Sequence, residues 1–297
     1  MAAPRPTVKD LLSRTTEDIE AFLGGIYEHA PWVATKLCDI KSDDIGTVTE
    51  LAKVMKSIVD NSTREIKLEL LRAHPDLCER VGKMEGLTDA SKEEQSRAGL
   101  QSLTSAELEK FTKMNTSYKQ KFGFPFILAV RNANKYTVLA ALEGRENNTP
   151  EKEFLTALEQ VHKIAWMRLL SCLNTEDSKG FLTCHVLDTA KGCPAAKMRI
   201  ELRRVSPPEM AGLVGSFVTN DDGRLDGGPA LKGKDFTVGI YEWTFYVADY
   251  FAASGSSVAG QPFLDQVPLR FGIDNPDDHY HVPLLVSPWS FSTYRGS

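Results

Sequence analysis

The spacing of hydrophobic positions changes once along the chain, close to Leu173. Before that point apolar residues recur every three or four positions, which predicts amphipathic helices. Two such helical faces are formed by Ile19, Phe22, Leu23, Ile26 and Tyr27, and by Val48, Leu51, Met55, Ile58 and Val59. Further along, apolar and polar residues alternate, which predicts strands with one buried face. The clearest alternating runs are 198–203 and 241–247.

Local signals refine the predicted helix ends. Thr104–Glu107 and Ser91–Glu94 each have the spacing of a capping box, which marks a helix start. Thr149 followed by Pro150 predicts the start of the last helix. That helix would bury Phe154, Leu158, Val161 and Ala165. Pro75 disfavours helix at the residue before it, so His74 is expected at the C-terminal edge of a helix.

A polar stretch, Asn174–Gly180, separates the two patterns and indicates a linker. Turn signals such as Asp221–Gly223 and Asn275–Pro276 recur between the predicted strands, which is typical of an antiparallel sandwich. We therefore predict a multi-domain protein. An all-α domain over residues 1–173 is followed by a linker over 174–180 and an all-β sandwich over 181–297.

Composition and charge narrow the class of function. A chain of 297 residues, 42% hydrophobic and 25% charged, is large enough for two globular cores. No apolar run approaches the ~18 residues of a membrane span, so no membrane insertion is expected. A net charge of −5 without a basic cluster argues against a nucleic-acid partner. The five cysteines have no CxxC spacing and predict reduced thiols inside the cell.

Candidate chemistry in the second domain gathers around three histidines. His279 and His281 stand two positions apart, so they would face the same side of a strand. Histidine suits a general base because its pKa of ~6.5 lies near neutral pH. Arginine, here Arg224, suits an oxyanion or a flat anionic ring. Two alternatives stay open: structural histidines with satisfied hydrogen bonds, and a zinc site formed by His185, His279 and His281.

The segment Thr183–Asp188 (T-C-H-V-L-D), taken with the final Tyr294–Ser297 (Y-R-G-S), resembles the 5-hydroxyisourate hydrolases, enzymatic relatives of transthyretin. The resemblance implies a transthyretin-like sandwich from about residue 181 onward, without a metal. It implies that His279 supports the site without acting on the substrate. Transthyretin itself lacks this histidine and this tail, which favours an enzyme over a carrier. The implied catalytic residues are His185, Arg224, His281 and Ser297, and the implied substrate-binding residues are Tyr294, Arg295 and Gly296.

Candidate chemistry in the first domain is more scattered. Arg168 lies at the edge of an apolar helical stripe, where a charge is costly unless it is paired or meets an anion. Taken singly, Glu94 is explained by its capping box. His74 is likewise explained by a helix C-terminus, which favours a protonated histidine. These residues alone do not establish a site.

As a set, H-P-D-L from His74, S-K-E-E-Q from Ser91, F-G-F-P-F-I from Phe122 and the late Arg168 resemble the decarboxylases of 2-oxo-4-hydroxy-4-carboxy-5-ureidoimidazoline (OHCU). The resemblance covers roughly residues 7–172. It implies His74 as proton donor beside Glu94, both catalytic, and no cofactor, because the substrate's own ring delocalises the carbanion left by CO₂. The implied substrate-binding residues are Pro75, Ser91, Gln95, Phe126, Ile127, Val130 and Arg168.

The two resemblances form a sequence of reactions, because the product of the hydrolases is the substrate of the decarboxylases. Fused in this order, the domains resemble the allantoin synthase family of urate degradation. This implies hydrolysis of 5-hydroxyisourate to OHCU, then decarboxylation to (S)-allantoin. The alternative is a transthyretin-like binding or signalling scaffold that has lost the chemistry. The implied partners are these two small-molecule substrates and further copies of the chain, with tetramer contacts through the β-domain and dimer contacts through the α-domain.

The expected location is the cytoplasm, with the peroxisome as the alternative. Fused relatives can carry an internal R-L-x5-H-L peroxisomal signal. Here Arg168–Leu169 is followed at that spacing by Thr175–Glu176. Arg295–Ser297 is not an S-K-L-type address.

Overall fold

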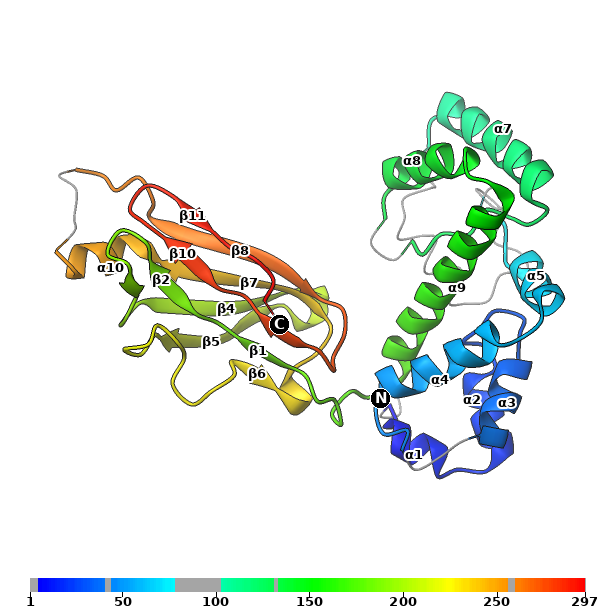
Figure 1. Ribbon diagram of the computed structural model, residues 1–297, viewed down its shortest axis with the longest axis horizontal. Coiled ribbons are helices and arrows are strands. Elements are labelled where there is room, and N and C mark those ends of the chain that lie inside the picture. The colour runs from blue at the N-terminus through cyan, green and yellow to red at the C-terminus, as the bar shows by residue number, and fades with distance from the viewer. Residues whose placement is uncertain (1–4, 41–43, 78–102, 131–132, 256–259, 297) are drawn as a thin grey trace. The chain divides into compact units, whose positions relative to one another are not determined.

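The chain forms two compact units in the computed structural model, Met1–Leu173 and Asn174–Ser297 (Figure 1). The first is helical and the second is built on β-sheets, so the predicted fold class is confirmed. No helix in the described part of the chain is long and apolar enough to cross a bilayer. The structure describes residues 5–40, 44–77, 103–130, 133–255 and 260–296.

The helical unit is organised around its longest helix, α9. This helix contacts α4, α5 and α7. It begins at Pro150 after the predicted cap Thr149 and buries the predicted apolar face. The described helices are α1 Val8–Leu12, α2 Thr16–Leu23, α3 Trp32–Ile40, α4 Val48–Asp60, α5 Arg64–Ala73, α7 Ser105–Phe122, α8 Lys135–Glu146 and α9 Pro150–Cys172.

Helix α2 is shorter than its hydrophobic pattern predicts. It ends at Leu23, so Ile26 and Tyr27 lie in the turn that leads to α3. Both side chains are nevertheless buried, at 6% and 3% exposure. The physical reason is the pair Gly24–Gly25, since glycine disfavours helix by about 1 kcal/mol per residue relative to alanine. This turn matters below because it carries side chains into a pocket.

Other predicted helix ends agree with the structure. Thr104 and Glu107 form the expected capping box at the start of α7. Helix α7 ends at Phe122, and Gly123 adopts the left-handed φ of 77° that favours glycine. Helix α5 ends at Ala73, which leaves His74 in an extended conformation before Pro75. The predicted start at Ser91–Glu94 lies outside the described residues.

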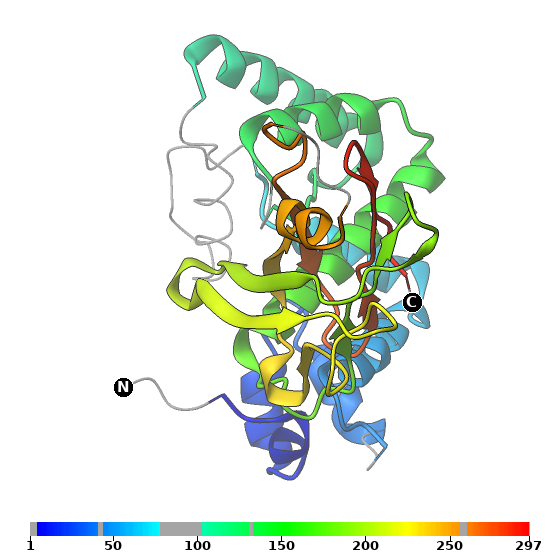
Figure 2. The ribbon, with the colours of Figure 1, turned by 90° about the vertical axis from the view of Figure 1, so that its left-hand side faces the viewer.

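The β-unit has two layers that share one core (Figure 1 and Figure 2). One layer is the antiparallel sheet β5-β4-β7-β8, and the other comprises the sheets β6-β1-β9 and β11-β10-β2-β3. The strands are β1 Phe181–Thr183, β2 Val186–Asp188, β3 Cys193–Pro194, β4 Arg199–Ser206, β5 Gly212–Val218, β6 Leu231–Lys232, β7 Gly239–Tyr246, β8 Gln266–Ile273, β9 His279–His281, β10 Leu284–Val286 and β11 Phe291–Ser292.

Two details of the β-unit depart from the sequence pattern. Val247 does not extend the strand before it but begins a helix, α10 Val247–Ala253. The end of the predicted linker is also part of the β-unit. Lys179 N–H donates to Asp277 Oδ1 at 2.8 Å, and a Cβ at Gly180 would lie 2.4 Å from the Pro276 carbonyl oxygen. Only glycine fits this close approach.

Candidate functional site

Strands β1 and β9 bring a threonine and two histidines to one face of the β-unit. The strands pair in parallel, with Thr183 opposite His281 and Phe181 opposite His279. Leu182 and Tyr280, which lie between them in sequence, point into the core with exposures of 0% and 2%. Because side chains alternate along a strand, the flanking residues point outward together.

The Thr183 hydroxyl bridges the two histidines. Its Oγ1 lies 2.8 Å from His279 Nε2 and 2.9 Å from His281 Nδ1. A hydroxyl has one hydrogen, so it donates to one ring and accepts from the other. Sequence reasoning missed Thr183. The signal that would have found it is the parallel register opposite His281, which no local pattern encodes.

His185 and Arg224 join this face from neighbouring segments. His185 occupies the break between β1 and β2 and forms an isolated bridge with Arg224. Its ring centroid lies 6.5 Å from that of His281. The turn before Arg224 requires Gly223, at φ +72°, because a Cβ there would lie 2.3 Å from the Val186 carbonyl oxygen. The predicted histidines and the arginine are therefore neighbours in space.

Burial and charge set the protonation of the two histidines. Burial lowers the pKa of His185, and the nearby Arg224 lowers it further. The pKa of His281 is lowered by burial, then by Arg224, His279 and His185. A pKa below the ordinary value of 6.5 leaves both rings neutral at pH 7. A neutral imidazole can accept a proton from water, as hydrolysis requires.

The C-terminal segment reaches the same face through its glycine. Gly296 N–H donates to the His281 carbonyl at 2.8 Å, and His281 N–H donates back at 3.3 Å. A Cβ at Gly296 would lie 2.8 Å from His281 Cδ2, so glycine permits this approach. Arg295 instead bonds Asp278 at 3.1 Å, and Tyr294 is 58% exposed. Ser297 lies outside the described residues.

The helical unit has a pocket beside His74. Its atom-free space is ≈ 360 Å³, a volume that includes open solvent at its mouth. The predicted residues His74, Pro75, Phe126, Ile127, Val130 and Arg168 all line it, together with Glu28, Leu77, Leu128 and Ile164.

His74 is oriented by its backbone neighbour one turn earlier. Its Nδ1 lies 3.0 Å from the Leu70 carbonyl oxygen. A carbonyl only accepts, so Nδ1 carries a hydrogen and Nε2 remains for proton exchange. Burial lowers the pKa of His74, against the opposing effects of the Leu70 contact and Glu28. The ring is therefore neutral at pH 7.

Arg168 meets a carboxylate that sequence reasoning missed. Its Nη2 forms an ion pair with Glu28, and both side chains are buried, at 6% and 2% exposure. Its Nη1 donates to the Gly25 carbonyl at 3.2 Å. A buried charge is tolerated when paired and hydrogen-bonded. The only local hint in the sequence is an acidic residue within the apolar run 26–30.

Comparison with known proteins identifies both units. A family model described as OHCU decarboxylase matches residues 13–170, and one described as HIUase/Transthyretin family matches residues 182–296. The chain belongs to both families. The OHCU decarboxylase of Haloferax volcanii is 44% identical over 158 residues, which are 53% of this chain and 90% of that relative.

The β-unit and the whole chain have similar relatives as well. The 5-hydroxyisourate hydrolase of Pseudomonas aeruginosa is 53% identical over 118 residues, which are 40% of this chain and 92% of that relative. A solved structure described as the crystal structure of (S)-allantoin synthase is 63% identical, with a TM-score of 0.85. The match covers 98% of this chain and 100% of that one, so the fused arrangement has a full-length counterpart.

In this member of the OHCU decarboxylase family, residues 126–130 form one wall of the pocket, and side chains from α8 and α9 hydrogen-bond to the backbone of this segment. Arg145 Nη1 donates to the Ile127 carbonyl at 2.7 Å, and Ala129 N–H donates to Gln160 Oε1 at 3.1 Å. Arg145 is itself paired with Glu153, which is fully buried. These contacts fix a wall that has no regular secondary structure.

Several predicted residues of the two families cannot be placed. Ser91, Glu94 and Gln95 lie outside the described residues, so the pairing of Glu94 with His74 stays a prediction. In the described part of the chain no three His, Cys, Asp or Glu side chains cluster closely enough to hold a metal ion. The Thr183 hydroxyl takes one nitrogen of His279 and one of His281.

Proposed function

We propose that the chain catalyses two consecutive steps of urate degradation. The β-unit hydrolyses 5-hydroxyisourate to OHCU, and the helical unit decarboxylates OHCU to (S)-allantoin. The observation that carries the proposal is that each unit places neutral histidine beside an arginine: His74 with Arg168 in the helical unit, and His185 and His281 with Arg224 in the β-unit. Full-length similarity to an (S)-allantoin synthase supports it.

For hydrolysis, the Thr183 bridge gives His281 two protonation patterns. If His281 Nδ1–H donates to Thr183, the hydroxyl donates to His279, and His281 Nε2 is free to accept a proton from water. If the hydrogen bonds reverse, His281 Nε2 carries a hydrogen and can protonate the leaving nitrogen. Arg224 supplies positive charge for the developing oxyanion.

For decarboxylation, His74 Nε2 acts on the substrate. Because the ring is neutral, it first accepts a proton, which the 4-hydroxyl of OHCU can supply. After CO₂ leaves, the ring returns that proton to the neighbouring carbon, C5, from the side on which it lies, which gives one enantiomer. The 4-hydroxyl thereby becomes a carbonyl, and a proton from water neutralises the ring nitrogen that carries the electron pair left by CO₂. Arg168 holds the substrate carboxylate and Glu28 balances its charge.

Freshly prepared 5-hydroxyisourate given to the purified protein tests the proposal. Ultraviolet absorbance follows loss of the substrate and of OHCU, while circular dichroism follows the chirality of the allantoin. We expect 5-hydroxyisourate and OHCU to disappear faster than in buffer and one enantiomer of allantoin to accumulate. Racemic allantoin formed at the uncatalysed rate would refute the function and favour the binding-scaffold alternative.

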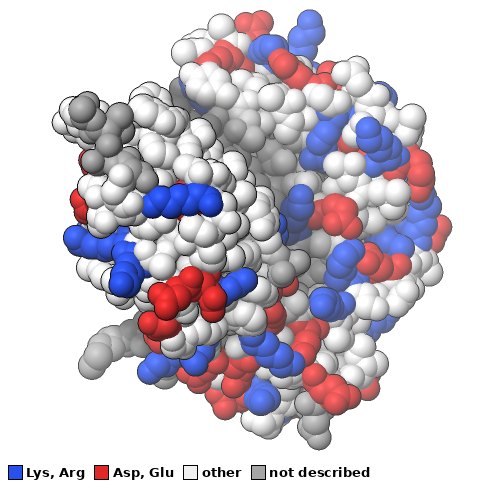
Figure 3. Space-filling view, turned by 60° about the vertical axis from the view of Figure 1, so that its left-hand side comes forward, with Lys and Arg blue, Asp and Glu red and all other residues white. Residues whose placement is uncertain are grey.

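We propose that the chain assembles as a homo-oligomer, as a tetramer through the β-unit with dimer contacts through the helical unit. Large apolar side chains on the edge strand β5 support this, with Leu213 at 53% and Val218 at 55% exposure. Figure 3 shows wide uncharged areas on this unit. Light scattering after size exclusion tests the assembly, and a monomer at micromolar concentration contradicts it.

We propose a cytoplasmic location. The support is that Thr175–Glu176 follow Arg168–Leu169 at the spacing where an internal R-L-x5-H-L signal has His-Leu. Imaging of the untagged protein with an antibody tests this, and colocalisation with a peroxisomal marker would overturn it.

A further inference from the structure

The turn between α2 and α3 carries Glu28 into the decarboxylase pocket without the support of regular secondary structure. Residues 24–29 form neither helix nor strand. The turn begins with Gly24 and Gly25, and His29 has a left-handed φ of 54°. Glycine pairs and left-handed residues do not fix a backbone by themselves. Backbone hydrogen bonds such as Ile26 N–H to the Leu23 carbonyl at 3.0 Å support the turn locally, and contacts with other elements add to them.

The first of these contacts comes from Arg168 on α9. Its guanidinium bonds the carbonyls of Gly25 and Ile26 at 3.2 and 3.4 Å and pairs with the Glu28 carboxylate. The same arginine lines the pocket. A shift of the turn would therefore move the group that holds the substrate's carboxylate.

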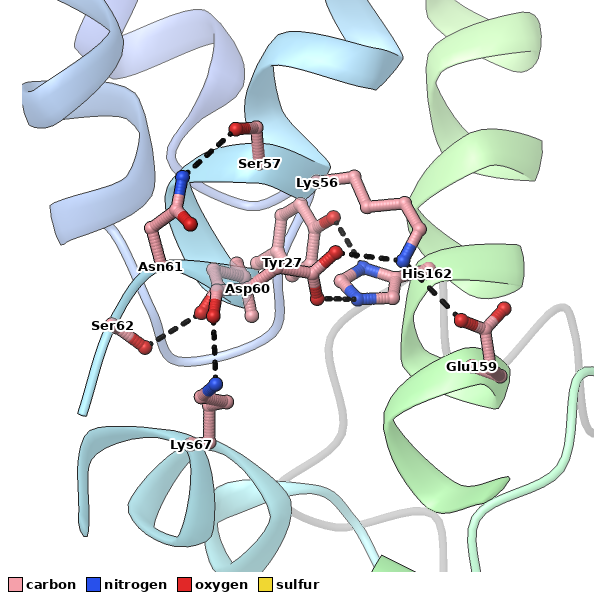
Figure 4. A network of polar contacts seen from close by, with 10 residues as sticks. Tyr27, Lys56, Ser57, Asp60, Asn61, Ser62, Lys67, Glu159 and His162 are labelled. Atoms are coloured by element: carbon pink, nitrogen blue, oxygen red, sulfur yellow. Dashed lines mark hydrogen bonds and ion pairs between the residues drawn. The ribbon is translucent and has the colours of Figure 1, made fainter. Parts of the chain in front are cut away.

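The second contact is made by Tyr27, which stands between Ile26 and Glu28, two of the residues that Arg168 contacts. Its hydroxyl lies 2.8 Å from His162 Nδ1, also on α9, and His162 Nε2 lies 3.1 Å from Asp60 Oδ1 at the end of α4 (Figure 4). Tyr27 and His162 are buried, at 3% and 8% exposure. The three side chains form one continuous hydrogen-bonded chain.

The direction of these hydrogen bonds follows from chemistry. The Asp60 carboxylate only accepts, so His162 Nε2 carries a hydrogen. Burial, and secondarily Lys56, lowers the pKa of His162 while Asp60 opposes the shift. The ring is therefore neutral at pH 7, and its Nδ1 accepts the Tyr27 hydroxyl hydrogen. Each hydrogen bond therefore has one defined direction: Tyr27 donates to His162, and His162 donates to Asp60.

Asp60, the last residue of this hydrogen-bonded chain of side chains, is held in place by two lysines. Lys56 Nζ lies 2.8 Å from Asp60 Oδ2 and 3.3 Å from Glu159 Oε1, which joins α4 to α9. Lys67 Nζ donates to the Asp60 carbonyl at 2.7 Å. Asp60 is thus fixed although its side chain is 45% exposed.

We infer that Tyr27 and His162 are positioning residues of the decarboxylase site, which hold the α2–α3 turn so that Glu28 meets Arg168. The inference rests on the proposed function of the helical unit. Two residues of α9, six positions apart in sequence, hold consecutive residues of one turn. Neither Tyr27 nor His162 lines the pocket, so their effect on the reaction passes through Glu28 and Arg168.

The test measures decarboxylation of supplied OHCU by the full chain carrying Tyr27→Phe, His162→Leu or His162→Gln. Loss of the hydrogen bond between Tyr27 and His162 lets the turn shift. Misplacement of a substrate-binding group by about 1 Å can lower the reaction rate roughly a hundredfold. We expect Tyr27→Phe and His162→Leu to raise KM and lower kcat/KM by about ten- to a hundredfold. His162→Gln should restore most of the activity, because its amide can accept from Tyr27 and donate to Asp60.

A double-mutant cycle separates positioning from general stability. If Tyr27 acts through Glu28, Tyr27→Phe should cost nothing further in a Glu28→Gln background. Equal, additive losses in both backgrounds would overturn the inference. If Glu28→Gln does not fold, the contrast between His162→Leu and His162→Gln still decides, and equal activities of those two variants would refute a positioning role.

The pH profile gives an independent readout. Protonated His162 would direct Nδ1–H at the Tyr27 oxygen, against the hydroxyl hydrogen, with Lys56, Asp60 and Glu159 as the other charged groups around the ring. His162→Gln should therefore remove one ionisation from the acid side of the kcat/KM profile. An unchanged profile contradicts the inference.

A matched control variant and the wild-type rate distinguish failure of the proposed decarboxylase function from failure of the positioning role of Tyr27 and His162. Tyr241→Phe removes a buried tyrosine hydroxyl from the β-unit, where it donates to the Thr237 carbonyl at 2.9 Å. It should leave OHCU decarboxylation unchanged. A wild-type protein that does not decarboxylate OHCU would refute the proposed function. An active wild type with fully active Tyr27→Phe and His162→Leu variants would refute only the inference.

Discussion

The two sites of the chain differ most in how far they shut out water. In the helical unit His74 and Arg168 are each only 6% exposed, and Glu28 is 2% exposed. In the β-unit His185 and His281 are half-buried, and Arg295 keeps 59% of its side-chain surface exposed. The difference matches the two chemistries. Hydrolysis consumes water, whereas a carbanion that must be protonated on one face has to be kept from it.

The largest expected effect is a separation of the two activities by one histidine each. His74→Ala should slow OHCU decarboxylation by about 10²–10⁴-fold, because general acid–base help is worth that much. The remaining allantoin should be racemic, since solvent then supplies the proton from either side. His281→Ala should instead slow only the loss of 5-hydroxyisourate. Both rates are measured by absorbance with each substrate supplied separately, and loss of both activities in either variant would contradict independent sites.

A second test removes residues 295–297 from the open site. We expect hydrolysis to fall by about a hundredfold, comparable to the loss of a group that stabilises an oxyanion. The Gly296 contact with His281 is lost, but the core of the β-unit is untouched. Thermal unfolding should therefore change little. Parental hydrolysis by the truncated chain would exclude the tail from the site.

A third test sharpens the comparison within the open site. Thr183→Val keeps the shape of the side chain but removes the hydroxyl between His279 and His281. We expect about a tenfold loss of hydrolysis, since one unsatisfied polar partner costs about 1–3 kcal/mol. Thr183→Ser should retain the activity. If Val and Ser behave alike, the bridge has no role in the reaction.

The smallest expected effect concerns stability and pH. Burial lowers the pKa of His74 and His162 below 6.5, so the unfolded chain binds more protons than the folded one as the pH falls. Their contribution to stability is complete above pH 6.5 and is lost as the pH falls through the lowered pKa values. Calorimetry of the full chain should show the helical unit losing several degrees between pH 7.5 and 5. A His162→Gln variant should lose less, and an equal loss would contradict this assignment.

The sequence predicts elements well and partners poorly. The buried face of α9, the cap at Thr104 and the alternation in β4 and β7 follow from neighbours within a few residues, and the structure confirms them. The partners of Arg168 and Tyr27 lie 140 and 135 residues away, so no local pattern reveals them. The same holds for Thr183, which stands 98 residues from His281.

The predicted continuation of the first helical face beyond Leu23 is wrong because the hydrophobic pattern does not reveal where the helix ends. Apolar residues at 26 and 27 continue the helical spacing because the turn buries them too, so periodicity alone cannot distinguish the two structures. The glycine pair was the available evidence against helix. For the site, the resemblance to the OHCU decarboxylases supplied what local patterns could not: it named His74, Pro75 and Arg168, which the structure places around one pocket.

The bridge between His281 and Gly296 also has a consequence for the order in which activities appear during synthesis. The ribosome makes the whole helical unit before it makes any of the β-unit, and Gly296 comes 123 residues after Leu173. At about 5–20 residues per second, this interval is on the order of ten seconds. The helical unit can therefore fold before the contact between His281 and Gly296 exists.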